Sequence, residues 1–186
     1  MKNDFILPIL ALSMVCLVMA GALGIVNNLT SPIIEEGRIE RADAARRDII
    51  PGASFSQIHI EAGEIDDFPA SFVSAYVAEG ADGSTPGMVL TVDTRGFGGI
   101  MRVIAGINLD GVLISSAVLS HNETPGLGTG VFGILESTIE SGGINAVTLH
   151  EIDSIAGSTV TMDAYRQALN DAFAAFEIIV KRGLHE

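Results

Sequence analysis

The fold is decided by one stretch, which reads Gly99-Ile100-Met101-Arg102-Val103-Ile104-Ala105-Gly106-Ile107-Asn108-Leu109-Asp110-Gly111-Val112-Leu113-Ile114-Ser115-Ser116-Ala117-Val118-Leu119. Two apolar runs rich in β-branched residues flank the pair Asp110-Gly111, and this arrangement is typical of a tight β-hairpin. The stretch therefore predicts two antiparallel strands, at residues 99–107 and 112–119.

More strands are expected on the N-terminal side of this hairpin. Residues 71–78 and 87–92 have the same β-branched and apolar content, and turn residues follow each of them at 81–84 and 94–96. Residues 54–119 therefore read as short strands separated by turns, which predicts an antiparallel sheet.

A long helix is expected after the sheet, at residues 162–181. Its apolar stripe has helical spacing and comprises Tyr165, Ala168, Leu169, Ala172, Phe173, Phe176, Ile179 and Val180. We expect Thr161 to be its N-cap and Asp163 to lie in its first turn, where the helix dipole favours negative charge. Between sheet and helix, residues 130–141 predict a short helix and residues 147–149 a short strand.

The N-terminal part of the chain predicts a membrane anchor. Residues 5–26 carry no charge and would form a helix about 33 Å long at roughly 1.5 Å per residue, enough to cross a bilayer core. A cleaved signal peptide is the alternative, but its apolar region is usually only about 7–15 residues long. Residues 1–4 then form a short tail.

A helical connector is expected between the anchor and the sheet domain, over residues 27–52. It begins with a polar break at 27–32, continues as a helix at about 33–50 and stops at Pro51-Gly52. Residues 53–186 form one further domain. The predicted fold class is α+β, with a single transmembrane helix followed by one antiparallel-sheet domain with flanking helices.

Composition excludes several functions. The formal net charge is −13, so the chain does not neutralise phosphates as a nucleic-acid-binding protein does. Its single cysteine, Cys16, lies inside the first apolar run, so neither an internal disulfide nor a thiolate metal cluster can form.

Three motifs could carry chemistry. Residues 153–161 form a small, hydroxyl-rich segment before the long helix, and such a helix start is suited to hold a phosphate. Residues 96–99 read Gly-Phe-Gly-Gly, which fits a turn or bulge and also lets backbone approach a flat ligand closely. Residues 121–128 contain His121 and Glu123, and a lone pair of this kind in a loop is usually surface structure.

Together these motifs resemble the FMN-binding domain of the RnfG and NqrC subunits of membrane redox pumps. Residues 123–128 match its Glu-Thr-Pro-Gly-Leu-Gly signature without departure, and residues 96–99 and 106–111 match its glycine motifs. Residues 153–159 match Asp-x-x-[Ser/Thr]-Gly-Ala-Thr except at Ala156 and Ser158. The resemblance covers roughly residues 96–180 and the N-terminal anchor.

The resemblance implies a covalent cofactor. In this family a flavin transferase esterifies the final threonine of the motif to the phosphate of FMN, so Thr159 is the implied attachment residue. Ser158 and Thr161 remain alternative acceptors. The other implied FMN-binding residues are Asp153, Gly157, Ser158, Thr161, Glu123, Thr124, Leu127, Gly128, Gly98 and Gly99.

The implied function is that of an electron-carrier subunit, without a substrate site of its own, in an Rnf-type ferredoxin:NAD oxidoreductase that pumps ions. Other membrane and peripheral subunits would be its partners. The alternatives are an NqrC-type subunit of a quinone reductase, a membrane-tethered binding or assembly module with a degenerate flavin site, and a stand-alone flavin reductase.

The resemblance also implies a single-pass protein of the inner membrane whose FMN domain lies on the extracytoplasmic side. The count of positive residues predicts the reverse, because only Lys2 precedes the anchor, whereas four arginines follow it closely: Arg38, Arg41, Arg46 and Arg47.

Overall fold

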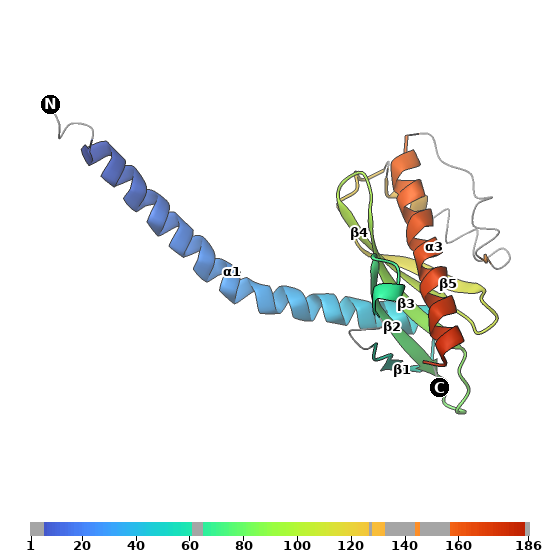
Figure 1. Ribbon diagram of the computed structural model, residues 1–186. Coiled ribbons are helices and arrows are strands. Elements are labelled where there is room, and N and C mark those ends of the chain that lie inside the picture. Colours follow the sequence, from blue (N-terminus) through green and yellow to red (C-terminus); the bar gives the residue numbers. More distant parts are fainter. Residues whose placement is uncertain (1–5, 61–64, 127, 133–143, 146–156, 185–186) are drawn as a thin grey trace. The chain divides into compact units, whose positions relative to one another are not determined.

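The computed structural model describes residues 6–60, 65–126, 128–132, 144–145 and 157–184 (Figure 1). The chain divides into two compact units, Met1–Arg41 and Ala42–Glu186. A long apolar helix, a five-stranded antiparallel sheet and a C-terminal helix make up the described elements, which confirms the predicted α+β class.

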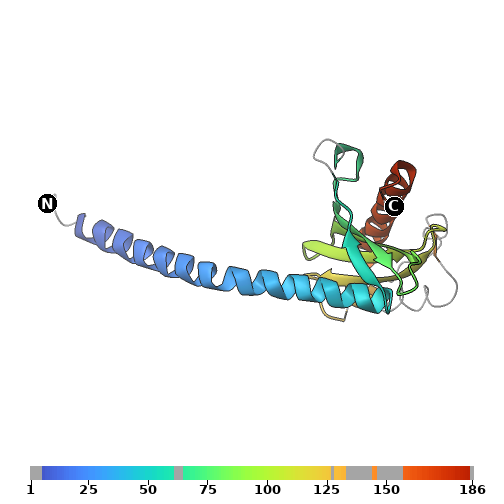
Figure 2. The same ribbon diagram turned by 90° about the horizontal axis from the view of Figure 1, so that it is seen from below.

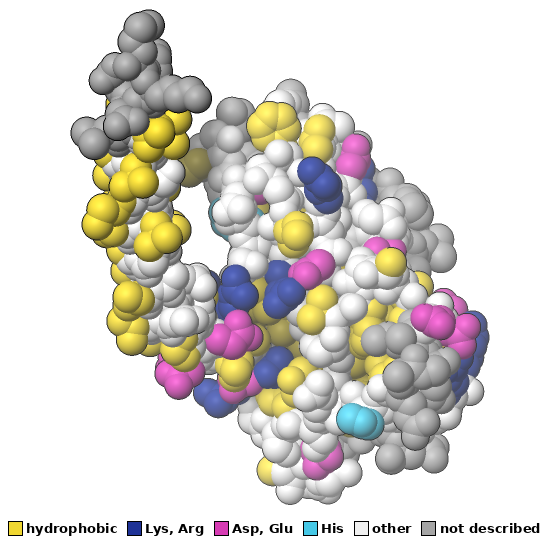
Figure 3. Space-filling view, turned by 60° about the vertical axis from the view of Figure 1, so that its left-hand side comes forward, with side chains coloured by type: hydrophobic (Ala, Val, Ile, Leu, Met, Phe, Trp, Pro, Cys, Tyr) yellow, Lys and Arg dark blue, Asp and Glu magenta, His cyan; other side chains and the backbone are white. Residues whose placement is uncertain are grey.

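The first unit is built from α1, which spans Ile6–Ile49 and ends in the second unit. Large apolar side chains along its first half are exposed, and Figure 3 shows them as a largely yellow surface. Among the described residues, only α1 is long and apolar enough to cross a membrane, from Pro8 onward. This finding agrees with a membrane anchor.

The predicted break at residues 27–32 is wrong, because α1 continues through Pro32. A proline inside a helix removes one backbone hydrogen bond and clashes with the preceding turn, which usually kinks or ends the helix. Thr30, one of the polar residues of the expected break, lies within the helix, where its hydroxyl donates a hydrogen bond to the Val26 carbonyl at 2.8 Å. The expected helix at 33–50 is therefore the continuation of α1.

The sheet is a simple meander in which each strand pairs with the next, in the order β1-β2-β3-β4-β5. The strands are β1 (Ser54–Gln57), β2 (Phe72–Glu79), β3 (Gly87–Arg95), β4 (Ile100–Ile107) and β5 (Leu113–Ser120). The four longer strands confirm the sequence prediction within a few residues. A 3-10 turn, η1 (Ile65–Asp67), lies between β1 and β2.

The predicted hairpin joins β4 to β5. Asn108 donates its backbone N–H to the Val112 carbonyl at 2.9 Å, and Gly111 donates to the Asn108 carbonyl at 3.0 Å. Gly111 has a φ of 78°, a left-handed conformation that glycine adopts without strain. The turn that the Asp110-Gly111 pair predicts is therefore confirmed.

One face of the sheet packs against α3 (Thr159–Arg182), as Figure 1 and Figure 2 both show. Seven of the eight residues of the predicted apolar stripe are buried on α3, whereas Val180 is 37% exposed. The seven form the main core with the inward residues of the strands, among them Met88, Leu90, Val92, Met101, Val103 and Ile107. Gly183 ends α3 with a φ of 68°, and its N–H donates to the Val180 carbonyl.

The other face packs against the last turns of α1, within the second unit. Ile49 and Ile50 form a small apolar cluster with Ala78, Val89 and Ile104. The helix approaches the sheet closely, because a Cβ atom placed on Gly106 would lie 2.2 Å from Cγ2 of Ile49.

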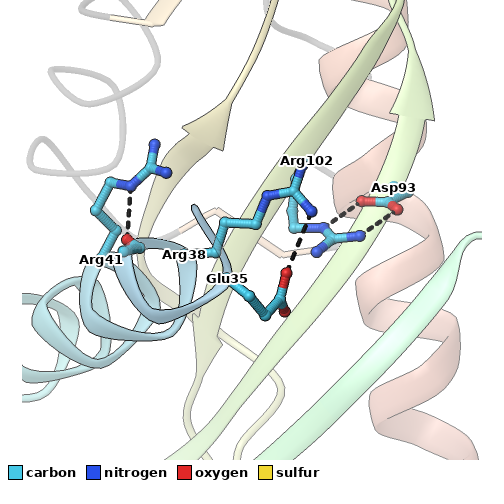
Figure 4. Close-up of polar contacts among 6 residues, drawn as sticks. Glu35, Arg38, Arg41, Asp93 and Arg102 are labelled. Carbon is cyan, nitrogen blue, oxygen red and sulfur yellow. Dashed lines mark hydrogen bonds and ion pairs between the residues drawn. The ribbon is translucent and has the colours of Figure 1, made fainter. Parts of the chain in front are cut away.

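An ion pair joins the neighbouring strands β3 and β4. Asp93 and Arg102 lie opposite each other in β3 and β4, and two hydrogen bonds of 2.7 Å join their side chains (Figure 4). Such a bidentate pair fixes the orientation of both side chains.

Two predicted elements fall largely outside the described residues. Only residues 130–132 of the expected helix at 130–141 are described, and these are helical. The expected strand at 147–149 lies entirely outside them.

Candidate functional site

A cavity of about 360 Å³ lies at the N-terminal end of α3. Its lining comes from three segments that are distant in sequence and comprises Phe97, Glu123, Thr124, Gly128, Gly157, Ser158, Thr159, Val160 and Thr161. These segments are the three motifs found in the sequence. The fold therefore brings together what the sequence presents separately.

Most of the predicted site residues meet at this cavity. Seven line it: Glu123, Thr124, Gly128, Gly157, Ser158, Thr159 and Thr161. Gly98 is close by, because its N–H donates to Oε1 of Glu123 at 3.0 Å. Gly99 shares the turn of Gly98 but is not among the lining residues, and Asp153 and Leu127 lie outside the described residues.

Thr161 is not the N-cap of α3, contrary to the sequence prediction. The helix begins earlier, because the Met162 N–H already donates to the Ser158 carbonyl at 2.9 Å, and Ser158 is the N-cap residue. Asp163 consequently lies beyond the first turn. The Thr161 hydroxyl instead donates to Oε2 of Glu123 at 2.6 Å, a partner 38 residues away in the sequence.

The three hydroxyl groups of this segment differ in accessibility. Ser158 is 5% exposed and Thr161 is 2% exposed, whereas Thr159, the first residue of α3, is exposed. Among the three predicted acceptors, Thr159 is therefore the one whose side chain is open to solvent.

The start of α3 also supplies hydrogen-bond donors. The first backbone N–H groups of a helix have no partner within the helix and carry the positive end of its dipole. With neighbouring hydroxyl groups, this arrangement suits a phosphate. A cavity of this volume is also within the range of about 300–1,000 Å³ typical of small-molecule sites. The donors and the space both fit FMN.

The glycine turn 96–99 closes one side of the site. Gly96 donates its N–H to the Gly99 carbonyl at 2.9 Å, and Gly99 has a φ of 132°. A Cβ atom on Gly98 would lie only 1.9 Å from the Asn122 carbonyl oxygen. Glycine is required at position 98 because the turn lies directly against the loop that carries Glu123.

Glu123 is buried, contrary to the general expectation for a His–Glu pair in a loop. Only 5% of Glu123 is exposed, and its backbone N–H donates to Nδ1 of His121 at 3.2 Å. Its carboxylate faces Gly98 and Thr161 rather than the imidazole. The pair is therefore part of the site's framework.

Two lining residues were missed by the sequence prediction. Phe97 is 76% exposed and Val160 is 54% exposed, so both leave apolar surface at the cavity. The signal that could have identified Phe97 was its position inside the glycine motif 96–99. Val160 gave no signal beyond its place within the hydroxyl-rich segment.

Comparison with known proteins shows that the residues lining the cavity lie within a known domain. Residues 96–174 match the model of the FMN-binding domain. The chain is 28% identical to the G subunit of the Na(+)-translocating ferredoxin:NAD(+) oxidoreductase complex of Acetobacterium woodii, over 92% of this chain and 91% of that protein.

The chain is also similar to the G subunits of two further complexes. The chain is 22% identical to the G subunit of the proton-translocating ferredoxin:NAD(+) oxidoreductase complex of Clostridium ljungdahlii, over 87% of this chain and 85% of that protein. It is 29% identical to the G subunit of the ion-translocating oxidoreductase complex of Stutzerimonas stutzeri, over 63% of this chain and 52% of that protein. The matched domain contains the cavity, and the similarity to the G subunits extends over most of the chain, so this chain carries an FMN-binding domain and resembles those G subunits beyond it.

Proposed function

We propose that this chain is the electron-carrying RnfG component of an Rnf-type ion-translocating ferredoxin:NAD oxidoreductase complex and holds FMN through a phosphoester on Thr159. One observation carries the proposal. Thr159 is an exposed hydroxyl-bearing residue at the first position of α3, and it lines a cavity built from three motifs of the FMN-binding domain.

The residues around the cavity have distinct tasks in this proposal. Thr159 forms the covalent tether, and the first N–H groups of α3 neutralise the phosphate charge. Phe97 and Val160 offer apolar surface to the ring system. FMN, when bound, supplies the exchange of one or two electrons, while the protein supplies position and electrostatic environment.

Partner subunits complete the proposed reaction. With one cysteine in its sequence, this chain cannot hold an iron–sulfur cluster through four thiolates. We assign the ferredoxin contacts to other subunits of the complex. We assign the NAD site and the ion pathway to other subunits as well. In this arrangement α1 anchors the flavin domain beside the membrane subunits, and a tether on Thr159 keeps the cofactor from being lost.

The proposal places the FMN domain on the extracytoplasmic side of the inner membrane. A cysteine introduced at the exposed turn residue Ser84, in a Cys16→Ser chain, tests this placement. A membrane-impermeant maleimide should label it in intact spheroplasts. Labelling only after lysis would reverse the orientation and favour the arginine count.

The covalent link is tested by peptide mass spectrometry of the protein from its native membrane. We expect one esterified FMN on the peptide that contains Thr159, its loss in Thr159→Ala and its retention in Thr159→Ser. Flavin on Ser158 or Thr161 would correct the attachment site and keep the function. An unmodified peptide from membranes with active complex would refute the carrier function and favour a tethered assembly module.

A further inference from the structure

The carboxylate of Glu123 joins two walls of the cavity. Oε1 accepts a hydrogen bond from the Gly98 N–H at 3.0 Å, and Oε2 accepts one from the Thr161 hydroxyl at 2.6 Å. Gly98 belongs to the turn between β3 and β4, whereas Thr161 lies in the first turn of α3. Glu123 itself follows β5, so a single side chain connects three segments.

The surrounding backbone is shaped to admit this carboxylate. A Cβ atom on Gly96 would lie 2.2 Å from Oε1 of Glu123, and one on Gly128 would lie 2.8 Å from Oε2. Contacts this short are sterically forbidden for a side-chain carbon. Glycine at both positions is therefore the condition under which Glu123 can occupy its place.

Burial makes the two hydrogen bonds indispensable. Glu123 is 5% exposed, and in the part of the chain that the structure describes no lysine or arginine forms an ion pair with it. A buried carboxylate without a cation is strongly unfavourable unless donors replace its hydration. The Gly98 N–H and the Thr161 hydroxyl are those donors, and hydrogen bonds to an ionised acceptor are stronger than neutral ones.

The bond to Thr161 also affects its neighbour. Thr161 lies two residues after Thr159, so fixing its side chain fixes the first turn of α3. The Thr161 hydroxyl is directed to Glu123, while Thr159 stays exposed at the cavity.

We propose that Glu123 is a positioning residue: it locks the glycine turn to the first turn of α3 and thereby presents Thr159 for FMN attachment. The part concerning attachment rests on the function proposed above. The lock itself is a property of the chain before any flavin is bound.

Hydrogen exchange tests the lock without flavin. Full-length chain in detergent, in a Thr159→Ala background that prevents attachment, is compared with the same chain carrying Thr161→Val or Thr161→Ser. Valine has the shape of threonine without its donor, whereas serine keeps the donor. We expect Thr161→Val to speed exchange roughly 10- to 100-fold in peptides covering both 96–99 and 158–163, the effect of losing one charge-assisted hydrogen bond. Thr161→Ser should leave both near the parent rate.

Peptides from β3 serve as the control for global unfolding, because this strand lies in the main core. If Thr161→Val also exposes β3, Glu123→Gln takes over the test, since glutamine keeps the side-chain size and one acceptor oxygen. Faster exchange at 158–163 alone, with the glycine turn unchanged, would overturn the lock.

Attachment is measured separately, in chains that retain Thr159 and are made with the flavin transferase. The fraction of peptide carrying FMN on Thr159 should fall about tenfold in Thr161→Val, the size expected for one lost hydrogen bond, and should be restored in Thr161→Ser. Normal attachment in Thr161→Val would refute the positioning role. Absence of FMN from the parent chain would refute the proposed function instead, and the exchange experiment would still decide the lock.

Discussion

The guanidinium carbon of Arg46 lies 3.9 Å from the centre of the Tyr76 ring. Arg46 is buried at the end of α1 and also forms an ion pair with Asp43, one turn earlier. A cation stacked on an aromatic face and shielded from water contributes up to about 2 kcal/mol. This contact therefore holds the last turns of α1 on β2, on the sheet face opposite α3.

Arg46→Ala should lower the free energy of unfolding of the second unit by roughly 2–4 kcal/mol, because it removes the stacked cation and leaves a gap. Tyr76→Leu should have a smaller effect of the same sign, and Tyr76→Phe, which keeps the ring, should be nearly neutral. Near-UV circular dichroism during urea unfolding in detergent measures this. Equal losses in Tyr76→Phe and Tyr76→Leu would contradict the stacking.

Gly106→Ala should destabilise the second unit by about 1–3 kcal/mol, since the added methyl group overlaps Cγ2 of Ile49. Ile49→Ala removes the overlapping atom, so the double variant should lose less than the sum of the two single variants. Gly37→Ala is the matched control, because nothing lies within 4 Å of its added Cβ and alanine favours helix. Additive losses would show that the two sites do not touch.

Phe97→Ala should change the unfolding free energy by less than about 0.5 kcal/mol, as for most exposed positions. Its effect should appear in the cofactor, as a shift in the absorption spectrum or the reduction potential of bound FMN. Leu109→Ala, another exposed apolar position in the β4–β5 turn, should alter neither. An unchanged flavin in Phe97→Ala would show that the ring does not contact it.

The Asp82 carboxyl should titrate below its usual pKa of 3.8, because the Ser84 hydroxyl and the Ser84 backbone N–H both donate to its ionised form. Since the folded-state pKa is lowered, the contribution of this turn to stability is complete above the unfolded pKa. It is lost as the pH falls through the folded value. Carbon-13 NMR of the carboxyl group measures the midpoint, and Ser84→Ala should move it back toward 3.8.

The hairpin, the sheet and the buried face of α3 could be predicted from sequence because their signals are local. Asp110-Gly111 specifies its own turn, and the α3 stripe repeats at helical spacing along the whole helix. β1 was not predicted individually. Its four residues include Ser54, Ser56 and Gln57, and it is a strand because its backbone pairs with β2.

The interior of the site could not be predicted because its partners are far apart in sequence. Thr161 looks like an N-cap when only its neighbours are considered, and only the folded chain brings Glu123 to its hydroxyl. The same applies to the burial of Glu123, which depends on Gly96 in another segment and on Gly128 at the end of its own segment. The three motifs can be recognised one by one, but their mutual contacts are a property of tertiary structure.

The enclosure of Glu123 has a consequence for how this sequence can drift. Gly96 is held as glycine by the carboxylate of Glu123, and Gly128 by the carboxylate and the Cβ atom of the same residue. The buried carboxylate is tolerable only while its donors remain. Two signatures that look independent in the sequence therefore obey one steric condition. A descendant that shortened Glu123 would free Gly96 to accept a larger residue, whereas a Cβ atom on Gly128 would still lie 2.8 Å from the Cβ of residue 123. A descendant that first enlarged Gly96 would force the glutamate out of its place. Change at Gly96 and Glu123 is expected to follow that order.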